Sequence, residues 1–340
     1  MNVLHWRREV RYQIAFILHT CAPRCFPLSM SAMSAELRLE PCRSALNRVT
    51  GMPFAWSLNP YMGCAHRCTF CYVRAFERRA ERPSDDRYGR SIRVKTNVVA
   101  VLRHELARAS WGRQMVLVGA ATDPYQPAEG RFRLTRGCLE AFAERSSPFS
   151  IITRGPMVVR DIDVLQTAAR RARVWVSLSV PTLDDTIWRI TEPGTAPPRQ
   201  RLRAVRALAD AGVRVNVALA PILPGLSDRP ELMAEAVRAA RDAGAARLWT
   251  ELLYLRPGTR EHFLETLAEV WPSEAARLAE AYGKRAYPPR EAAQANVARV
   301  ARLAQLHPRR AGAPGWIEPE PPRMAIQLGL GLDAFADTPG

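Results

Sequence analysis

Strand-like and helix-like segments alternate along the middle of the sequence. Short apolar runs rich in β-branched residues and bounded by Gly, Pro or Asp predict strands, and they span 54–58, 116–119, 149–153, 174–180, 213–220 and 248–253. Apolar residues at helical spacing lie between them, as in Leu202, Val205 and Leu208 before Gly212. Strands that alternate with helices form a parallel sheet with right-handed crossovers, so the sequence predicts an α/β fold. The pattern alone allows either a barrel or an open doubly wound sheet.

Three cysteines stand in a C-x3-C-x2-C arrangement after the first predicted strand: Cys64, Cys68 and Cys71. Thiolates are the preferred ligands of iron–sulfur clusters, and a cubane 4Fe–4S cluster usually takes four. Three ligands from one loop leave one iron open for chemistry. A structural zinc site needs a fourth Cys or His at short spacing, and His66 lies inside the triplet, where it could not easily close a tetrahedron. Disulfides would need an even count and an oxidising compartment, so the spacing favours the cluster.

The triplet, with an aromatic residue just before its last Cys, resembles the signature of the radical S-adenosylmethionine (radical SAM) enzymes. Other segments resemble the spore photoproduct lyase-like branch of that superfamily, often labelled DNA repair photolyase-like: T-D-P-Y-Q-x-x-E at 122–129, T-R-G at 153–155, E-P-G-T at 192–195 and A-P-I-L-P-G-L-S-D at 220–228. The resemblance covers about residues 39–307. It implies a partial (β/α)6 barrel of the TIM type with a C-terminal helical extension. None of these motifs fixes the substrate.

The resemblance also implies cofactors and chemistry. A 4Fe–4S cluster on the three cysteines would chelate the amino and carboxylate groups of SAM at its open iron. An electron from a flavodoxin- or ferredoxin-like donor would then cleave SAM reductively to methionine and a 5′-deoxyadenosyl radical, which attacks a substrate that the sequence does not identify. The alternative is a non-catalytic iron–sulfur protein that serves redox sensing or binds nucleic acid.

Residues just after the predicted strands are the candidates for SAM binding, because barrels of this type carry their chemistry at the C-terminal ends of the strands. Thr122 and Asp123 occupy the place that receives the SAM amino group in the superfamily, although Asp123 and Pro124 could instead only shape a turn. Arg154 follows the third predicted strand, where relatives often carry Lys, and could pair with the SAM carboxylate in bidentate fashion.

The remaining candidates have ordinary alternatives. Ser177 and Ser179 alternate along one strand and therefore share a face; they could bond the ribose or methionine part of SAM, or form a small-residue packing layer. Phe70 holds the place of the aromatic that packs near the adenine. Spore photoproduct lyase needs a Cys hydrogen donor beyond its cluster, and Cys138 is the only cysteine after the triplet. A helical Cys is usually a small buried hydrophobe, which is the competing interpretation of Cys138.

The two ends differ from the middle in composition. We expect a disordered extension over 1–38, the barrel with its cluster loop over 39–285, a C-terminal helix packed on the barrel over 286–307, and a Pro/Gly-rich tail over 308–340. The apolar stretch at 14–18 is too short for a signal peptide. The sequence contains no run of about eighteen apolar residues, so it predicts no membrane span. The seven cysteines suit a reducing cytoplasm.

The formal net charge is +16, from 49 basic and 33 acidic residues. Such an excess can mark a surface for nucleic acid, but nearly all of it is Arg, since Lys95 and Lys284 are the only lysines. An Arg-rich, Lys-poor composition can also reflect coding bias. If nucleic acid is the partner, the basic residues nearest the predicted mouth are Arg74, Arg78, Arg79, Arg131, Arg133 and Arg136.

Overall fold

A seven-stranded sheet organises the chain in the computed structural model, which describes residues 35–52, 54–288 and 290–319. The strand order is β10-β9-β8-β7-β6-β3-β2. The six that pair in parallel are β3 (Trp56–Leu58), β6 (Val116–Val118), β7 (Phe149–Thr153), β8 (Val174–Ser179), β9 (Val215–Ile222) and β10 (Leu248–Leu252). At one edge β2 (Leu46–Arg48) pairs antiparallel with β3. This succession matches a partial (β/α)6 barrel and confirms the predicted fold.

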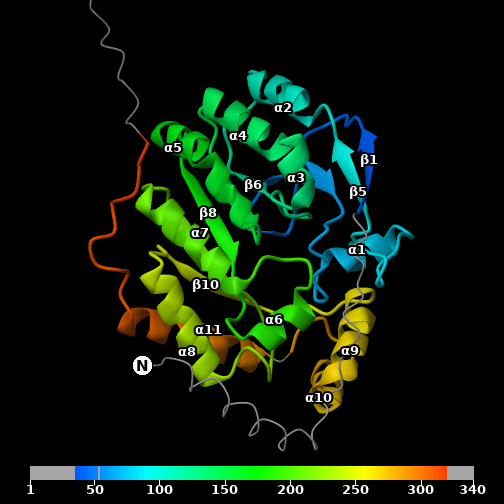
Figure 1. Cartoon of the computed structure of the whole chain (residues 1–340). Helices are drawn as coiled ribbons and strands as arrows, with labels where there is room; N and C mark the ends of the chain where they lie inside the picture. The colour runs from blue at the N-terminus through cyan, green and yellow to red at the C-terminus, as the bar shows by residue number, and fades with distance from the viewer. Residues whose placement is uncertain (1–34, 53, 289, 320–340) are drawn as a thin grey trace, which may run out of the picture. The chain divides into compact units, whose positions relative to one another are not determined.

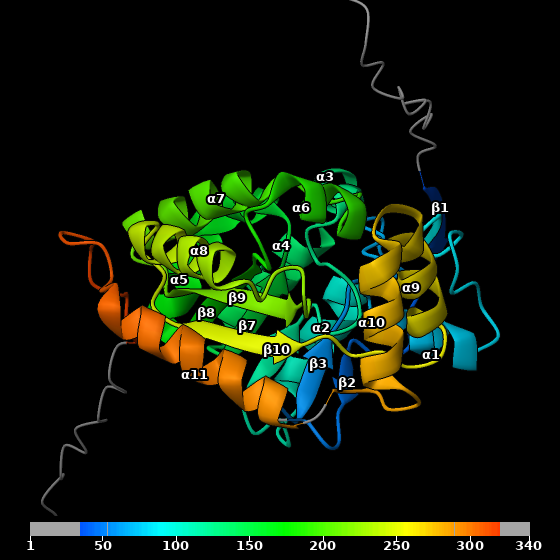
Figure 2. The same cartoon turned by 90° about the horizontal axis from the view of Figure 1, so that it is seen from below.

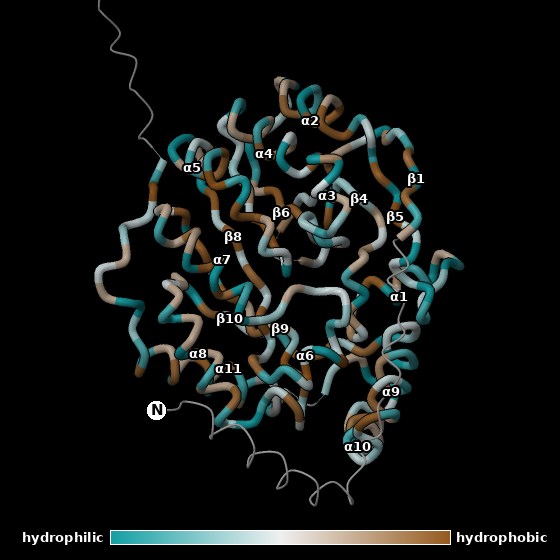
Figure 3. The backbone as a smooth tube through the Cα atoms, in the orientation of Figure 1, coloured by the Kyte–Doolittle hydropathy of each residue, from teal (hydrophilic) through white to brown (hydrophobic). Residues whose placement is uncertain are grey.

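Helices cover one face of the sheet, and Figure 1 shows them in an arc around the strands from α2 to α11. They are α2 (Val98–Ala107), α4 (Leu134–Glu144), α5 (Ile162–Arg171), α7 (Pro198–Asp210), α8 (Pro230–Asp242) and α11 (Arg290–Leu306). Val118 and Val176 on this face pack with Leu139 and Leu208 of the helices in one buried core. The strand β6 is accordingly brown, the hydrophobic colour, in Figure 3. Full burial of each such side chain contributes roughly 1.5–3 kcal/mol.

The opposite face of the sheet carries small and polar residues. Ser177 pairs in register with Asn216, and Ser179 with Ala218. All four side chains are buried, but none of them belongs to the core under the helices. That core contains the residues that alternate with them along the strands, such as Val176. Because side chains alternate across a strand, this face points away from the helices into the barrel lumen. The lumen is therefore polar where the helix-covered face is aliphatic.

A second, three-stranded sheet was not predicted from the sequence. It has the order β1 (Glu36–Glu40), β5 (Ser91–Lys95) and β4 (Tyr61–Met62). The strand β1 pairs in parallel with β5 and crosses the boundary expected at residue 38, so the last residues of the predicted extension belong to the folded unit. Since β4 ends two residues before Cys64, this sheet anchors the start of the cysteine loop.

The strands point their C-terminal ends toward a second group of helices. The described chain adds α1 (Val73–Arg79), α3 (Pro127–Phe132), the 3-10 turn η1 (Pro156–Asp161), α6 (Asp185–Thr191), α9 (Thr259–Val270) and α10 (Pro272–Tyr282). Figure 2 shows α9 and α10 together beyond the tip of β10. The helix α9 also contacts α1, which directly follows the cysteine loop. The cysteines thus lie at the end of the barrel where the prediction placed the chemistry.

The C-terminal part follows the predicted boundaries only partly. The expected helix over 286–307 is α11, which packs against β10 and α8. Residues 308–319, predicted as the start of a tail, lie on the barrel instead: Ile317 donates its N–H to the Gly212 carbonyl at 2.8 Å. Trp316 and Ile317 pack against the main core, which gives this segment an apolar reason to dock. The predictions for 1–34 and 320–340 lie outside the described residues. Within 35–52, 54–288 and 290–319, no helix has the length and apolar character to cross a membrane.

Candidate active site

The three cysteines lie on one compact loop between β4 and α1. Cys64 and Cys68 are 8% and 7% exposed, and Cys71 is partly exposed. Backbone turns fold the loop on itself, because Arg67 donates its N–H to the Cys64 carbonyl and Cys71 to the Cys68 carbonyl, both at 3.2 Å. Burial raises the pKa of Cys68 to about 12 and that of Cys64 well above its usual value. Bare thiolates are therefore costly here, and bound cationic iron would compensate them.

The arrangement fits a cluster better than a single ion. Among the residues that the structure describes, no trio of His, Cys, Asp or Glu is placed to hold one metal ion. Mononuclear zinc draws four ligands onto one centre, whereas each thiolate of a 4Fe–4S cluster binds its own iron. The donor set of Cys64, Cys68 and Cys71, all thiols from one loop, is the set that iron–sulfur clusters use.

The T-D-P-Y-Q segment after β6 binds this loop through side-chain hydrogen bonds. Thr122 Oγ1 donates to the Gly63 carbonyl at 2.6 Å, and Gln126 Nε2 donates to the same carbonyl at 3.1 Å. Gln126 Oε1 in turn accepts the N–H of Ala65 at 3.0 Å. Both side chains are buried, so these bonds fix the backbone around Cys64. Gln126 was not singled out from the sequence, although it stands inside a motif that was.

Asp123 ties three segments together. Its carboxylate accepts hydrogen bonds from Thr153 Oγ1 at 2.6 Å and from the Arg154 N–H at 2.7 Å. His66 Nδ1 lies 3.2 Å from Asp123 Oδ2, an ion-pair distance outside hydrogen-bonding geometry. Burial alone would raise the pKa of Asp123, but its interaction with His66 and the hydrogen bonds from Thr153 and Arg154 lower it to about 2. Asp123 thus links the cysteine loop to the end of β7; its contact with SAM, and that of Thr122, stays a prediction.

The end of α6 and the E-P-G-T turn that follows it also hold the cysteine loop. The Gly194 N–H donates to the His66 carbonyl at 3.1 Å, and the Thr69 N–H donates to Thr191 O at 2.9 Å. A Cβ atom on Gly194 would lie 2.5 Å from the Ala65 carbonyl oxygen and 2.7 Å from that of His66. Only glycine allows the two backbones to approach this closely.

Gly194→Ala is therefore expected to displace the cysteine loop and to lower the iron content of reconstituted protein severalfold, because backbone atoms on both sides cannot yield cheaply. Iron and sulfide assays after anaerobic reconstitution measure this. Gly112→Ala is the matched control, since its added Cβ would find its nearest neighbour at 4.0 Å. Equal iron content in the two variants would show that the E-P-G-T turn does not fix the position of the cysteine loop.

Arg154 lies beside Phe70, which stands within the cysteine loop. The Arg154 guanidinium is 5.4 Å from the centre of the Phe70 ring. Its Nε donates to Glu192 Oε1 at 2.5 Å and its Nη2 to the Ala220 carbonyl at 3.1 Å. The side chain is 19% exposed, so it keeps contact with the space at the strand ends. The structure thereby brings two of the predicted SAM residues next to each other.

Glu192, which accepts the hydrogen bond from Arg154, is itself held by a buried ion pair with a second arginine, Arg201. Arg201 Nη2 lies 2.9 Å from Glu192 Oε2, and the two side chains are 0% and 1% exposed. Burial would raise the pKa of Glu192, but the charges of Arg201 and Arg154 hold it below its usual value. Arg201 was missed from the sequence because a single arginine on an amphipathic helix carries no signal of burial.

Ser177 and Ser179 share the lumen face, as their alternation predicted. Their neighbour Asn216 is 8% exposed, and its Oδ1 is buried without a hydrogen-bond partner in the described part of the chain. A buried carbonyl oxygen that lacks a donor usually indicates a water or a ligand that supplies one. The lumen is therefore chemically prepared for a polar molecule.

Cys138 lies elsewhere. It is fully buried on α4 and packs in the core between helices and sheet, with Leu139 and Phe142. Burial raises the pKa of its thiol far above the usual value. It belongs to a different packing cluster from the three loop cysteines, so its environment is that of a packing residue and not of a hydrogen donor beside the lumen.

Several arginines expected at the mouth serve internal contacts. Arg74 is 1% exposed, and Arg136 pairs with Asp161 at 3.2 Å and Asp163 at 2.7 Å. Arg78 lies 3.3 Å from a Glu261 oxygen. Exposed members of the set are Arg78, Arg79, Arg131 and Arg133, so the pair of Arg78 with Glu261 lies on the surface.

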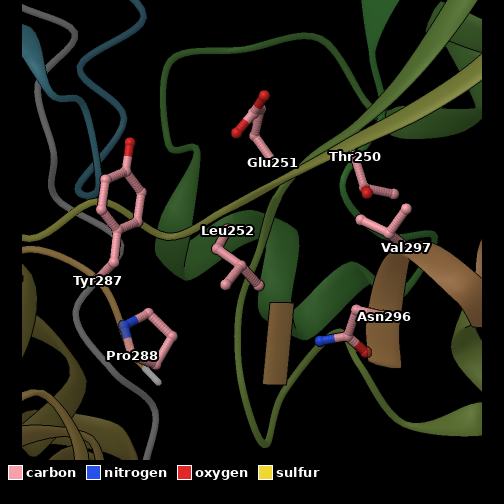
Figure 4. Close-up of a pocket in the computed structure, with 7 residues that line it drawn as sticks. All are labelled: Thr250, Glu251, Leu252, Tyr287, Pro288, Asn296 and Val297. Carbon is pink, nitrogen blue, oxygen red and sulfur yellow. The ribbon is translucent and has the colours of Figure 1, made fainter. Parts of the chain in front are cut away.

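A pocket of about 270 Å³ lies between β10 and α11 (Figure 4). Its lining comprises Thr250, Glu251, Leu252, Tyr287, Pro288, Asn296 and Val297. None of the predicted site residues borders it, so it is separate from the candidate active site.

Comparison with known proteins settles the family. The model of the radical SAM superfamily matches residues 58–236. This chain belongs to the radical SAM superfamily of enzymes. An uncharacterized protein of Mycobacterium tuberculosis is 38% identical over 251 residues, which cover 73% of this chain and 74% of the relative. An uncharacterized protein of Acidianus two-tailed virus is 27% identical over 224 residues, 62% of this chain and 71% of the relative.

Solved structures support the fold. A spore photoproduct lyase variant with bound AdoMet and dinucleoside spore photoproduct superposes with a TM-score of 0.59 at 17% identity, over 80% of this chain and 79% of that one. Another variant of that lyase gives a TM-score of 0.58 at 16% identity, with the same coverage. At these identities the likeness shows the shared fold, the partial barrel with helices at the C-terminus.

Proposed function

We propose that this radical SAM enzyme binds one 4Fe–4S cluster through Cys64, Cys68 and Cys71 and cleaves SAM reductively for a radical reaction on a substrate in the lumen. The observation that supports this most is the set of hydrogen bonds that hold the cysteine loop, formed by the T-D-P-Y-Q segment after β6 and by the end of α6 with its E-P-G-T turn. When bound and reduced, the cluster supplies the electron that breaks the C5′–S bond of SAM to give methionine and the 5′-deoxyadenosyl radical.

The chain's own residues bind and orient SAM in this proposal. Arg154 pairs with the SAM carboxylate through its guanidinium fork, and Glu192 holds that fork in place at 2.5 Å. Phe70 offers an aromatic face to the adenine. Ser177 and Ser179 offer hydroxyls to the ribose or methionine part. Thr122 and Asp123 stand at the end of β6 near the amino group, while their side chains keep the cysteine loop fixed.

The test of this assignment is SAM affinity. Arg154→Ala is expected to raise the SAM dissociation constant about tenfold or more, because a hydrogen bond to a charged group contributes roughly 1.5–3 kcal/mol. Equilibrium dialysis with cluster-loaded protein measures it. Arg214→Ala removes a 42% exposed arginine that pairs with Glu318 on the surface and serves as the control. Wild-type affinity in Arg154→Ala would move Arg154 from cofactor binding to structure.

We also propose that an electron donor of the flavodoxin or ferredoxin type docks beside α1. Tyr72 and Phe76, each 39% exposed, form an edge-to-face pair directly after Cys71. Arg79 lies over the Phe76 ring at 4.8 Å. An exposed aromatic patch with a basic rim, next to the least buried of the three loop cysteines, suits an acidic carrier. Chemical cross-linking of the carrier to α1 supports this, and cross-links confined to other surfaces contradict it.

A nucleic-acid substrate is the second proposal. The lyase variant that shares the fold holds a dinucleoside spore photoproduct, and Arg131 and Arg133 are exposed after the T-D-P-Y-Q segment. Each phosphate that they neutralise would release counterions and make binding fall steeply with salt. Filter binding that shows no affinity at low salt would leave a small molecule or a protein as the substrate.

A further inference from the structure

The segment between α1 and β5 closes over the cysteine loop. Its Tyr88 is 3% exposed and packs with Cys64 and Val73 in a small buried cluster. The Tyr88 hydroxyl lies 3.5 Å from Cys71 Sγ, within hydrogen-bonding distance for sulfur. A thiolate can only accept, so with Cys71 bound to iron the hydroxyl must be the donor.

Arg74 fastens this segment to the loop. The side chain is 1% exposed, and its guanidinium lies 4.6 Å from the centre of the Tyr88 ring. Its Nε donates to the Cys68 carbonyl at 3.2 Å, and its Nη1 to the Ser84 carbonyl at 2.8 Å. One buried arginine therefore holds the loop, the segment and the tyrosine ring in a single arrangement.

Gly89 permits the close approach. Its φ is +77°, and a Cβ there would overlap the Cys64 carbonyl oxygen. The backbone next to Tyr88 thus lies directly on the loop. The buried cluster, the Arg74 guanidinium and the close backbone contact at Gly89 together fix the position of the Tyr88 ring. This distinguishes its hydroxyl from that of a surface tyrosine that lies near a sulfur by chance.

We infer that Tyr88, positioned by Arg74, donates a hydrogen bond to the cluster ligand Cys71 and raises the reduction potential of the cluster. This inference rests on the proposed function. Reduction adds negative charge that spreads onto the thiolate ligands, and a hydrogen bond to a ligand sulfur stabilises the reduced form more than the oxidised form. Tyr88 acts through Cys71, by setting how readily the cluster accepts an electron.

Tyr88→Phe tests the inference because it removes only the hydroxyl. We expect iron content to stay near that of the wild type, while the midpoint potential falls by about 59 mV, equivalent to an about tenfold smaller equilibrium constant for one-electron reduction. A redox titration followed by EPR measures this without any turnover. Tyr282→Phe is the control, since the buried Tyr282 hydroxyl donates to the Leu253 carbonyl at 2.9 Å. The midpoint potential of the cluster in this variant should equal that of the wild type.

A second variant separates electronics from packing. Site-specific difluorotyrosine at position 88 keeps the shape but is a stronger donor, so the potential should rise. A wild-type potential in Tyr88→Phe, or a fall in the fluorinated protein, overturns the inference. If Tyr88→Phe assembles no cluster, the fluorinated protein decides alone. A wild-type chain that assembles no cluster would contradict the proposed function instead.

Discussion

Cys64→Ala is expected to abolish both the brown chromophore and the cleavage of SAM. In the proposed function the three loop thiols are the cluster ligands, so the loss of one would leave an iron without protein anchorage. Of the two remaining thiols, Cys68 is buried, and burial raises its pKa to about 12, so it has little tendency to ionise without metal. Iron and sulfide content and visible absorbance after anaerobic reconstitution measure the loss. Cys68→Ala and Cys71→Ala should behave alike.

Two other cysteines serve as matched controls. Cys42 is partly buried and Cys138 is fully buried in the main core. Cys42→Ala and Cys138→Ala should keep the cluster, because neither thiol lies on the loop. A Cys64→Ala protein with the full chromophore, or loss of the cluster in Cys138→Ala with the fold intact, would contradict the assignment of the ligands.

Glu192→Gln is expected to destabilise the protein by about 3–5 kcal/mol, the usual effect of removing one partner from a buried ion pair. The change leaves Arg201, which is 0% exposed, without a counter-charge and loosens Arg154. A domain is stable by only about 5–15 kcal/mol in total, so urea denaturation should reveal a large shift. The same change should weaken SAM binding, because Arg154 loses its support.

The control for this prediction is a surface pair. Glu144 and Arg103 are paired at 2.9 Å but are 51% and 46% exposed, and such pairs contribute about 0–1 kcal/mol. Glu144→Gln should therefore leave the urea midpoint nearly unchanged. If Glu192→Gln destabilises no more than Glu144→Gln, the buried pair of Glu192 and Arg201 is not a structural support of the site.

The sequence predicted the parallel strands because they are short segments rich in apolar and β-branched residues, as in β8 and β9. It missed the three-stranded sheet for a physical reason. The strand β4 has two residues, too few to show a pattern, and the alternation of apolar and polar residues in β1 and β5 spans only five residues each. The docking of 308–319 depends on Trp316 and Ile317 inside a Pro-rich stretch, where composition indicates a tail.

The candidate site shows the same division. The cysteine triplet is local and could be recognised from its spacing. The partners of Thr122, Asp123 and Gln126 lie about sixty residues away in sequence, so the motif was visible while its clamp on the loop was not. Charge was the least informative signal. Arg74 and Arg201 are buried structural residues, although in the sequence they count toward a net charge of +16.

The most direct measurement is the product of SAM in anaerobically reconstituted protein reduced with dithionite. The account predicts release of 5′-deoxyadenosine and methionine, absent from the Cys64→Ala protein, and an EPR spectrum of the reduced cluster that changes when SAM is added. A fully loaded cluster that yields no 5′-deoxyadenosine and whose spectrum ignores SAM would contradict it and favour a non-catalytic iron–sulfur protein.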